Sequence, residues 1–192
     1  MSSAAAAACD RISAMNPANV LAFWKAAGPD KWFERDIAFD SEIMTRFLAL
    51  WEAAAQGRLA DWEETPQGAL ALVIVLDQFP RNMFRDDAMT YSSDALAREV
   101  ASRALARGAD ARIDQTLLDF LYLPFMHSEE LSDQVRCVEL FRQSGDPGSL
   151  KYAEGHADII RRFGRFPHRN RILGRKTTPE EHAFLDQGGF SG

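Results

Sequence analysis

The sequence predicts an all-α protein, with about eight helices packed as antiparallel pairs. Three observations lead to this prediction. Capping residues stand directly before prolines, apolar residues recur at helical spacing, and no segment shows the alternation typical of a strand. The expected loops are short, and helices joined by short loops usually pack as antiparallel pairs, in a bundle or a helical-repeat stack.

Several helix starts are marked by a capping residue followed by proline. The polar side chain accepts a hydrogen bond from a backbone N–H that has no partner within the helix. Proline at the first helical position loses nothing, because its missing N–H would have no partner there. In the last such start, Glu181 follows Thr178 at the spacing of a capping box. These starts are Asn16-Pro17, Thr65-Pro66, Asp146-Pro147 and Thr178-Pro179.

Apolar spacing and stop signals bound each expected helix in turn. Glycine or proline supplies the stops, as at Gly57, Pro80, Gly108 and Pro124. Pro66 to Phe79 is nearly all apolar in its middle, and its length and proline-led start favour a buried helix over a buried strand. In chain order, the expected helices are Pro17–Ala27 closed by Gly28-Pro29, Glu34–Gln56, Pro66–Phe79, Ala88–Arg107, Arg112–Leu123, Glu129–Gln143, Pro147–Phe163 and Pro179–Asp186.

The composition is that of an ordinary globular protein. The 192 residues include 22 basic and 28 acidic side chains, giving a net charge of −6, and 46% are hydrophobic. This balance excludes collagen-like, wholly disordered and disulfide-scaffold chains, and argues against a surface coated with basic charge for nucleic acid. We expect a flexible tail over residues 1–15, one helical domain over residues 16–187, and a flexible end over residues 188–192.

The cysteines and the chain start indicate a cytoplasmic protein. Cys9 lies in the expected tail and Cys137 in a helical pattern, so a structural disulfide is not expected. Ala4 to Ala8 follow no basic segment, and five alanines make a poor signal peptide. The longest apolar run, Ala69 to Leu76, is far shorter than a membrane span.

Two polar segments at helix ends are candidate sites. Asp77, Arg81 and Asn82 stand at the end of the most apolar helix, where they either face a ligand or form a cap and ion pair that fix the chain's exit. Ser128 is the expected cap of Glu129–Gln143. His127 and Glu129 stand at the start of that helix, and the fixed spacing of known zinc signatures is absent, so no metal site is expected.

His156 lies on one helical face with Tyr152, Ile159 and Phe163. A histidine on such a face is more often a hydrogen-bonded core residue than a catalytic group. Both interpretations stay open from the sequence.

The segment from Arg161 to Lys176 holds seven of the 22 basic residues and no acidic one. Arginine forks suit carboxylate and phosphate geometry, so the segment indicates an anion site. It also fits arginines paired with acids elsewhere in the fold, or, because aromatic residues interleave the basic ones, RNA binding. A weak echo links Phe79-Pro80-Arg81-Asn82 with Phe166-Pro167-His168-Arg169-Asn170.

Together these motifs resemble the bacterial family called domain of unknown function 924. The matching stretches are Val20 to Trp24, Asp77 to Asn82, Phe120 to Pro124 with His127 to Glu129, and Arg162 to Asn170. The resemblance covers Asn16 to about Leu185 and implies a fold related to tetratricopeptide-repeat superhelices. It implies no established activity and no catalytic residues. The family pattern often has glycine where Asp86 follows Arg85 here.

We expect the marked segments to meet in one polar, arginine- and histidine-lined pocket that binds a small anionic ligand, with hydrolysis as one form of acid–base work. Two alternatives are an interaction module that binds an acidic peptide in a superhelical groove, and RNA binding through the basic segment, which the acidic remainder disfavours. Neither a cofactor nor a membrane is expected. The candidate catalytic residues are His127, His156 and Asp77. The candidate ligand-binding residues are Asp77, Arg81, Asn82, His127, Glu129, His156, Arg165, His168, Arg169 and Asn170.

Overall fold

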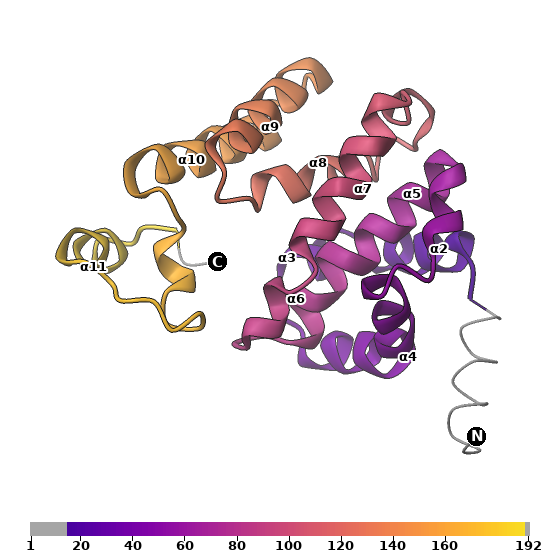
Figure 1. Ribbon diagram of the computed structural model, residues 1–192, viewed down its shortest axis with the longest axis horizontal. Coiled ribbons are helices and arrows are strands. Elements are labelled where there is room, and N and C mark those ends of the chain that lie inside the picture. Colours follow the sequence, from indigo (N-terminus) through magenta and orange to yellow (C-terminus); the bar gives the residue numbers. More distant parts are fainter. Residues whose placement is uncertain (1–14, 191–192) are drawn as a thin grey trace. The chain divides into compact units, whose positions relative to one another are not determined.

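A computed structural model describes residues 15–190, and this part of the chain contains helices and no strand. The all-α prediction is therefore confirmed; the tetratricopeptide-repeat-like superhelix stays a prediction. No helix in the described part is long and apolar enough to cross a membrane. The α-helices are α2 (Pro17–Ala27), α3 (Pro29–Phe33), α4 (Ile37–Ala55), α5 (Pro66–Val73), α6 (Phe79–Met83), α7 (Asp94–Ala106), α8 (Asp119–Met126), α9 (Leu131–Ser144), α10 (Pro147–Phe163) and α11 (Pro179–Asp186) (Figure 1).

The described chain divides into two compact units. Unit 1 comprises residues 15–85 and 89–124, and unit 2 comprises residues 86–88 and 125–190, so the boundary falls inside α8. One domain over residues 16–187 stays a prediction. Of the two expected flexible ends, residues 1–14 and 191–192 lie outside the described residues.

All of the predicted proline-led starts form as expected. Asn16 Oδ1 accepts from Asn19 N at 3.0 Å, and Asn19 Oδ1 accepts from Asn16 N at 3.2 Å, which makes a capping box. Thr178 and Glu181 form the predicted second box, with distances of 3.2 and 2.7 Å. The other caps are Thr65 on Gly68 N and Asp146 on Gly148 N and Ser149 N. Local side-chain chemistry therefore fixes these boundaries.

Two prolines do not end helices where the sequence predicts. After α5 the chain continues through a π-helical turn, Ile74–Gln78, into α6, where Pro80 occupies the first turn. There its missing N–H loses no helical bond, since the wider turn sets a new helix start. Pro124 lies inside α8, close enough to its end at Met126 that little helix follows the missing donor.

Other boundaries differ because side chains bond to nearby backbone. Asp114 Oδ1 accepts from Thr116 N at 3.0 Å, and this turn divides the helix expected over Arg112–Leu123. The helix expected over Ala88–Arg107 separates into the 3-10 turn Ala88–Tyr91 and α7. Gly28-Pro29 closes α2 as predicted and also starts α3, because proline suits a first helical turn.

Ser128 caps the chain before α9 in a different way from the one predicted. Its Oγ accepts from Glu130 N at 3.1 Å and donates to Asp133 Oδ2 at 2.7 Å. The helix itself begins two residues later than expected, at Leu131. The side chain of Ser128 therefore orders the turn that leads into the helix.

Unit 1 is built around α5 and its π-helical extension. Every side chain from Ala69 to Leu76 is buried, as predicted for a buried helix. Aromatic side chains from α2, α4, α6 and α8 pack against one another in this core; they include Trp24, Phe47, Phe79 and Phe120. Burial of such large rings is the main favourable contribution to this core.

Unit 2 is built on the pairing of α9 with α10, which Figure 1 shows side by side. Ile159 and Ile160 of α10 form a small buried cluster with Phe166, and Phe163 and Phe184 pack against it. Further 3-10 turns occur at Ala60–Glu64, Asp110–Arg112 and Pro167–Arg169. The last of these follows α10 and carries two of the predicted site residues.

Replacing Gly68 and Gly155 with alanine should have opposite effects on stability. A Cβ at Gly68 would lie 2.0 Å from the Trp62 carbonyl oxygen, whereas one at Gly155 would meet nothing within 4 Å. We expect Gly68→Ala to lower the free energy of unfolding by more than about 2 kcal/mol through backbone displacement. Gly155→Ala should raise it by about 0.5–1 kcal/mol through helix propensity. Urea denaturation followed by circular dichroism measures both, and equal effects would contradict the prediction.

Candidate functional site

The predicted site residues fall into two groups. Unit 1 holds Asp77, Arg81 and Asn82, whereas unit 2 holds the others. That both groups share one pocket stays a prediction. Within unit 2 the structure brings together the loop before α9 and the segment after α10, which carry His127, Glu129, Arg165, His168, Arg169 and Asn170.

In unit 1 the polar group surrounds the π-helical turn. Asp77 is fully buried; its Oδ2 accepts from Gln78 Nε2 at 2.6 Å, and its Oδ1 lies 3.4 Å from Arg81 Nη1. Arg81 also donates to both carboxylate oxygens of Asp94, at 2.9 and 3.0 Å. Burial opposes the charge of Arg81, but Asp77 and Asp94 raise the pKa of its guanidinium above its ordinary value. Asp77 and Arg81 therefore have partners within the unit.

Asn82 belongs to the same region through Asp40. Asn82 Nδ2 donates to Asp40 Oδ1 at 2.8 Å, and Arg85 donates to both Asp40 oxygens at 2.5 and 3.0 Å. The sequence does not reveal Asp40 or Asp94 as partners, because neither lies near the motif in the chain. π-Helical turns are frequent at functional sites, but here each predicted ligand-binding side chain contacts a side chain of its own unit.

In unit 2, Glu181 is the centre of one ionic cluster. It is 2% exposed and accepts two hydrogen bonds from Arg165, at 2.6 and 2.9 Å. Asn170 Nδ2 adds a third at 3.2 Å. The hydrogen bonds from Arg165, assisted by Thr178 N, outweigh burial and lower the pKa of Glu181 to about 2.

Glu129 forms a second cluster. Its carboxylate accepts two hydrogen bonds from Arg175, both at 2.8 Å, and one from Phe166 N at 2.9 Å. Burial alone would raise the pKa of Glu129, but these donors hold it below its ordinary value. The predicted site residue Glu129 is thus an anchor for the segment after α10.

Every arginine of the basic segment contacts an acceptor within unit 2. This arrangement supports the interpretation that the segment pairs with acids of the fold, and leaves Lys176 as its remaining cation. The contacts are Arg161 with Asp158 at 2.5 Å, Arg162 with Glu180 at 3.0 Å, Arg165 with Glu181 at 2.6 Å, Arg169 with the His127 carbonyl oxygen at 2.9 Å, Arg171 with Asp86 at 3.0 Å, and Arg175 with Glu129 at 2.8 Å.

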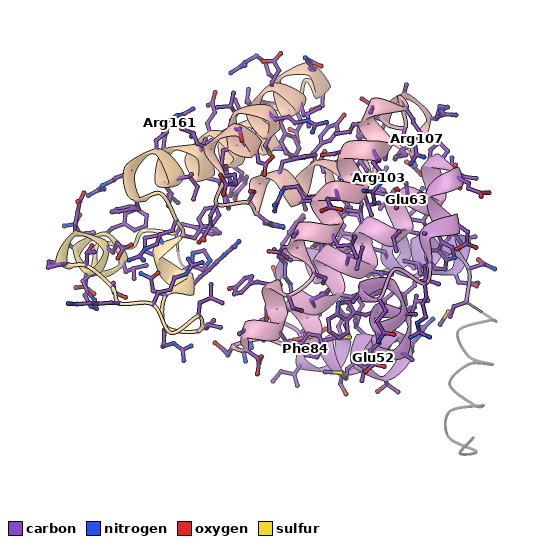
Figure 2. The ribbon with its side chains drawn as sticks, viewed as in Figure 1. Glu52, Glu63, Phe84, Arg103, Arg107 and Arg161 are labelled. Atoms are coloured by element: carbon purple, nitrogen blue, oxygen red, sulfur yellow. The ribbon has the colours of Figure 1, made fainter. Side chains whose placement is uncertain are left out.

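A similar ionic cluster in unit 1 lies outside the predicted site. Glu63 accepts from Arg103 at 2.8 Å through both oxygens and lies 3.5 Å from Arg107 (Figure 2). The hydrogen bond from Arg103 lowers the pKa of Glu63. Paired arginines are therefore a general feature of both units and do not by themselves mark a ligand site.

Two histidines, His156 in α10 and His168 in the 3-10 turn after it, lie close together. His156 is 8% exposed, and its Nδ1 lies 2.8 Å from the Tyr152 carbonyl oxygen. Because a carbonyl oxygen only accepts, Nδ1 carries the proton and Nε2 of the neutral ring is an acceptor. The Nδ1 atom of His168 is buried and has no hydrogen-bond partner among the described residues. Burial above all, with nearby cations, lowers the pKa of each histidine to about 4.

Two phenyl rings each contact both imidazoles. The centroid of Phe166 lies 5.6 Å from that of His156 and 5.6 Å from that of His168. Phe190 makes closer contacts, at 4.5 Å from His156 and 5.1 Å from His168. The two histidines therefore form one aromatic group with two phenylalanines.

A cavity of about 550 Å³ runs along the exposed face of α10. Aromatic and aliphatic side chains form most of its wall, while Gly148 and Gly155 keep the helix face open. Lys151 lies at this face, and no carboxylate pairs with it in the described part of the chain. The lining residues are Gly148, Lys151, Tyr152, Gly155, His156, Asp158, Ile159, Arg162, Phe163, Phe184 and Phe190.

His156 is the predicted site residue that lines this cavity. The sequence singled out its helical stripe with Tyr152, Ile159 and Phe163, and that stripe is the cavity wall. Lys151 and Phe190 were missed. All four lysines of the chain are exposed and Lys151 stands in no motif, while Phe190 comes from a segment that carries none. Among the described residues, no group of histidine, cysteine and acidic side chains lies in a geometry that would hold a metal ion.

The comparisons with known proteins agree with the motifs. Residues 20–189 match the family model described as "Bacterial protein of unknown function (DUF924)". A solved structure of a protein of unknown function from Agrobacterium tumefaciens, ATU0120, is 48% identical and superposes with a TM-score of 0.87, covering 90% of this chain and 97% of that one. No curated protein matches the sequence. The resemblance predicted from the sequence is confirmed.

The low pKa values of His156 and His168 predict that the protein loses stability in mild acid. The folded protein keeps His156 and His168 neutral to about pH 4, whereas in the unfolded chain they take up protons near pH 6.5. As pH falls through this window, each should lower the free energy of unfolding by up to about 1.4 kcal/mol per pH unit. Urea denaturation at pH 7.5, 6 and 5 measures the slope.

The exposed His182 supplies the control for this effect. His168→Gln should flatten the slope, whereas His182→Gln should leave it as in the unmodified chain. Equal slopes in all three proteins would contradict the assignment to the buried pair.

Proposed function

Since the chain belongs to this bacterial family, whose description names no activity, we propose from the geometry that unit 2 binds a small organic anion in the cavity along α10. The observation that carries the proposal is the combination of an apolar wall with a cation that has no carboxylate partner. Ligand sites are typically concave, mostly apolar, and supplied with a few polar groups that orient the ligand. Lys151 is the group that would attract a carboxylate here.

We propose Lys151 as the anchor because the arginines of unit 2 already have partners within the fold. Arg165 and Arg175 each make two hydrogen bonds to a carboxylate, and an external anion would have to displace that partner. Displacement leaves a partly buried carboxylate without its counter-ion, which is strongly unfavourable. Lys151 is exposed and has no such partner among the described residues, so binding there breaks no existing ion pair.

The histidine geometry supports binding over hydrolysis. A general base works best when its pKa lies near the working pH. His156 has a pKa of about 4, and its Nδ1 bonds to a backbone carbonyl where a catalytic dyad would place a carboxylate. The neutral ring is well suited to forming part of the apolar wall of the cavity.

The same pairing disfavours the two alternatives from the sequence. An acidic peptide or an RNA backbone would need several cations able to contact its charges. In the described part of unit 2, the arginines of the basic segment already contact acceptors of the fold. A single compact anion needs only one cation, which Lys151 would supply.

Hexanoate and its neutral analogue hexanamide test this proposal at pH 7. We expect hexanoate to bind more tightly, and Lys151→Ala to weaken its binding by up to about fivefold by removing the charge contact. Isothermal titration calorimetry provides the dissociation constants. Lys176→Ala is the matched control, since this exposed lysine of unit 2 does not line the cavity. Equal binding of both compounds, or equal loss in both variants, would show that Lys151 is not the anchor.

Filling the cavity tests its role independently of charge. Gly155 is exposed within α10, and a Cβ there meets no atom within 4 Å. Gly155→Leu should keep the helix, because leucine is a good helix former, and should abolish hexanoate binding by occupying the space. Far-ultraviolet circular dichroism checks the fold, and retained binding by a folded variant would contradict the proposed location.

A further inference from the structure

A short segment after α11 carries Phe190 over the histidine pair. Gly188 has φ of 79°, in the left-handed region that favours glycine. At Gly189 a Cβ would lie 2.5 Å from the Phe184 carbonyl oxygen and 2.6 Å from the Phe184 ring. Both glycines therefore allow the chain to fold back tightly over Phe184 and place the next residue, Phe190, at the cavity.

The phenyl ring of Phe190 lies edge to face with two imidazoles. The rings of Phe190 and His156 are inclined at 61°, and those of Phe190 and His168 at 80°. Such edge-to-face pairs are favoured by the ring quadrupoles. His156 and Phe190 both line the cavity, whereas His168 does not line it and contacts the ring of Phe190.

Phe190 is the more exposed of the two phenylalanines that contact both imidazoles. Phe190 is 38% exposed, whereas Phe166, which also contacts both imidazoles, is 1% exposed. Its described ring contacts are those with the two histidines. A ligand ring of similar size would make the same contacts while Phe190 moves into water.

We propose that the cavity is selective for anions that carry an aromatic ring, and that the ligand ring replaces Phe190 against His156 and His168. This inference rests on the proposed function, because Lys151 would hold the carboxylate. Lys151 precedes His156 by five residues, or about 7–8 Å along the helix axis. A ring joined to its carboxylate by a two-carbon spacer suits that separation once the reach of the lysine side chain is included.

The test compares 3-phenylpropionate with 3-cyclohexylpropionate, which has similar size and the same charge but no π system. We expect the aromatic compound to bind about two- to tenfold more tightly, because an edge-to-face contact with an imidazole stabilises a phenyl ring but not a cyclohexyl ring. Phe190→Ala should raise its affinity about threefold or more, since the competing ring is gone. Phe190→Leu, which keeps an apolar side chain, checks that any change does not come from a loss of folding.

Histidine signals in nuclear magnetic resonance locate the ring directly. The chain has 4 histidines, so each imidazole can be assigned by substitution. Addition of 3-phenylpropionate should shift the ring signals of His156 and His168 and leave those of the exposed His182 unchanged. Equal affinity for the two propionates, weaker binding in Phe190→Ala, or unshifted signals for both buried histidines would overturn the ring subsite.

Benzyl alcohol distinguishes failure of this inference from failure of the anion site. If Lys151 plays no part, this neutral aromatic compound should still shift His156 and His168, and the ring subsite stands without the anion site. If hexanoate binding depends on Lys151 but neither benzyl alcohol nor 3-phenylpropionate shifts these histidines, the anion site stands and the ring subsite is excluded.

Discussion

The buried carboxylate of Glu181 is the constraint on which the architecture of unit 2 depends. It belongs to α11 but accepts hydrogen bonds from Arg165 and Asn170, which lie in the segment after α10. A carboxylate that is 2% exposed is stable only when its oxygens have several donors. Since these donors come from another part of the chain, the charge fixes α11 against that segment. Phe184 and the turn leading to Phe190 are positioned by the same contact.

Glu129 connects the other side of the same segment. It receives the backbone N–H of Phe166 and both donors of Arg175, so the turn before α9 is joined to the chain after α10. These hydrogen bonds also position Phe166, whose ring contacts both His156 and His168. Two carboxylates thus hold a segment that has little regular structure and that carries His168.

The helix starts could be predicted because their causes are local. A cap such as Thr178 and its partner Glu181 lie three residues apart, and the sequence shows both. The continuation of the helical chain through Pro80 could not be predicted, because the π-helical turn that accommodates this proline depends on packing against the rest of unit 1. The basic segment drew attention for its charge, yet its partners Glu129, Glu180 and Glu181 are distant in sequence or simply part of a helix start. Lys151 had no pattern around it, since a cation becomes notable only when the fold leaves it unpaired beside an apolar wall.

The echo between the two Phe-Pro segments has a physical basis. In unit 1, Asp40 accepts one hydrogen bond from Asn82 and two from Arg85. In unit 2, Glu181 accepts one hydrogen bond from Asn170 and two from Arg165. Each unit therefore fixes a helix exit with the same set of groups: a carboxylate from another helix, a primary amide and a guanidinium.

This parallel separates the residues that hold the fold from those that the proposed ligand would contact. The remaining arginine of each segment, Arg81 or Arg169, donates to a backbone carbonyl as well, at Asp77 and His127. What differs is the residue after proline, since unit 2 inserts His168 there. Its imidazole takes no part in the shared set of contacts, and its buried Nδ1 has no hydrogen-bond partner in the described chain. Side chains in the shared set hold the fold, so the features specific to unit 2, namely His168, His156 and the open face of α10, are where selectivity for a ligand can arise.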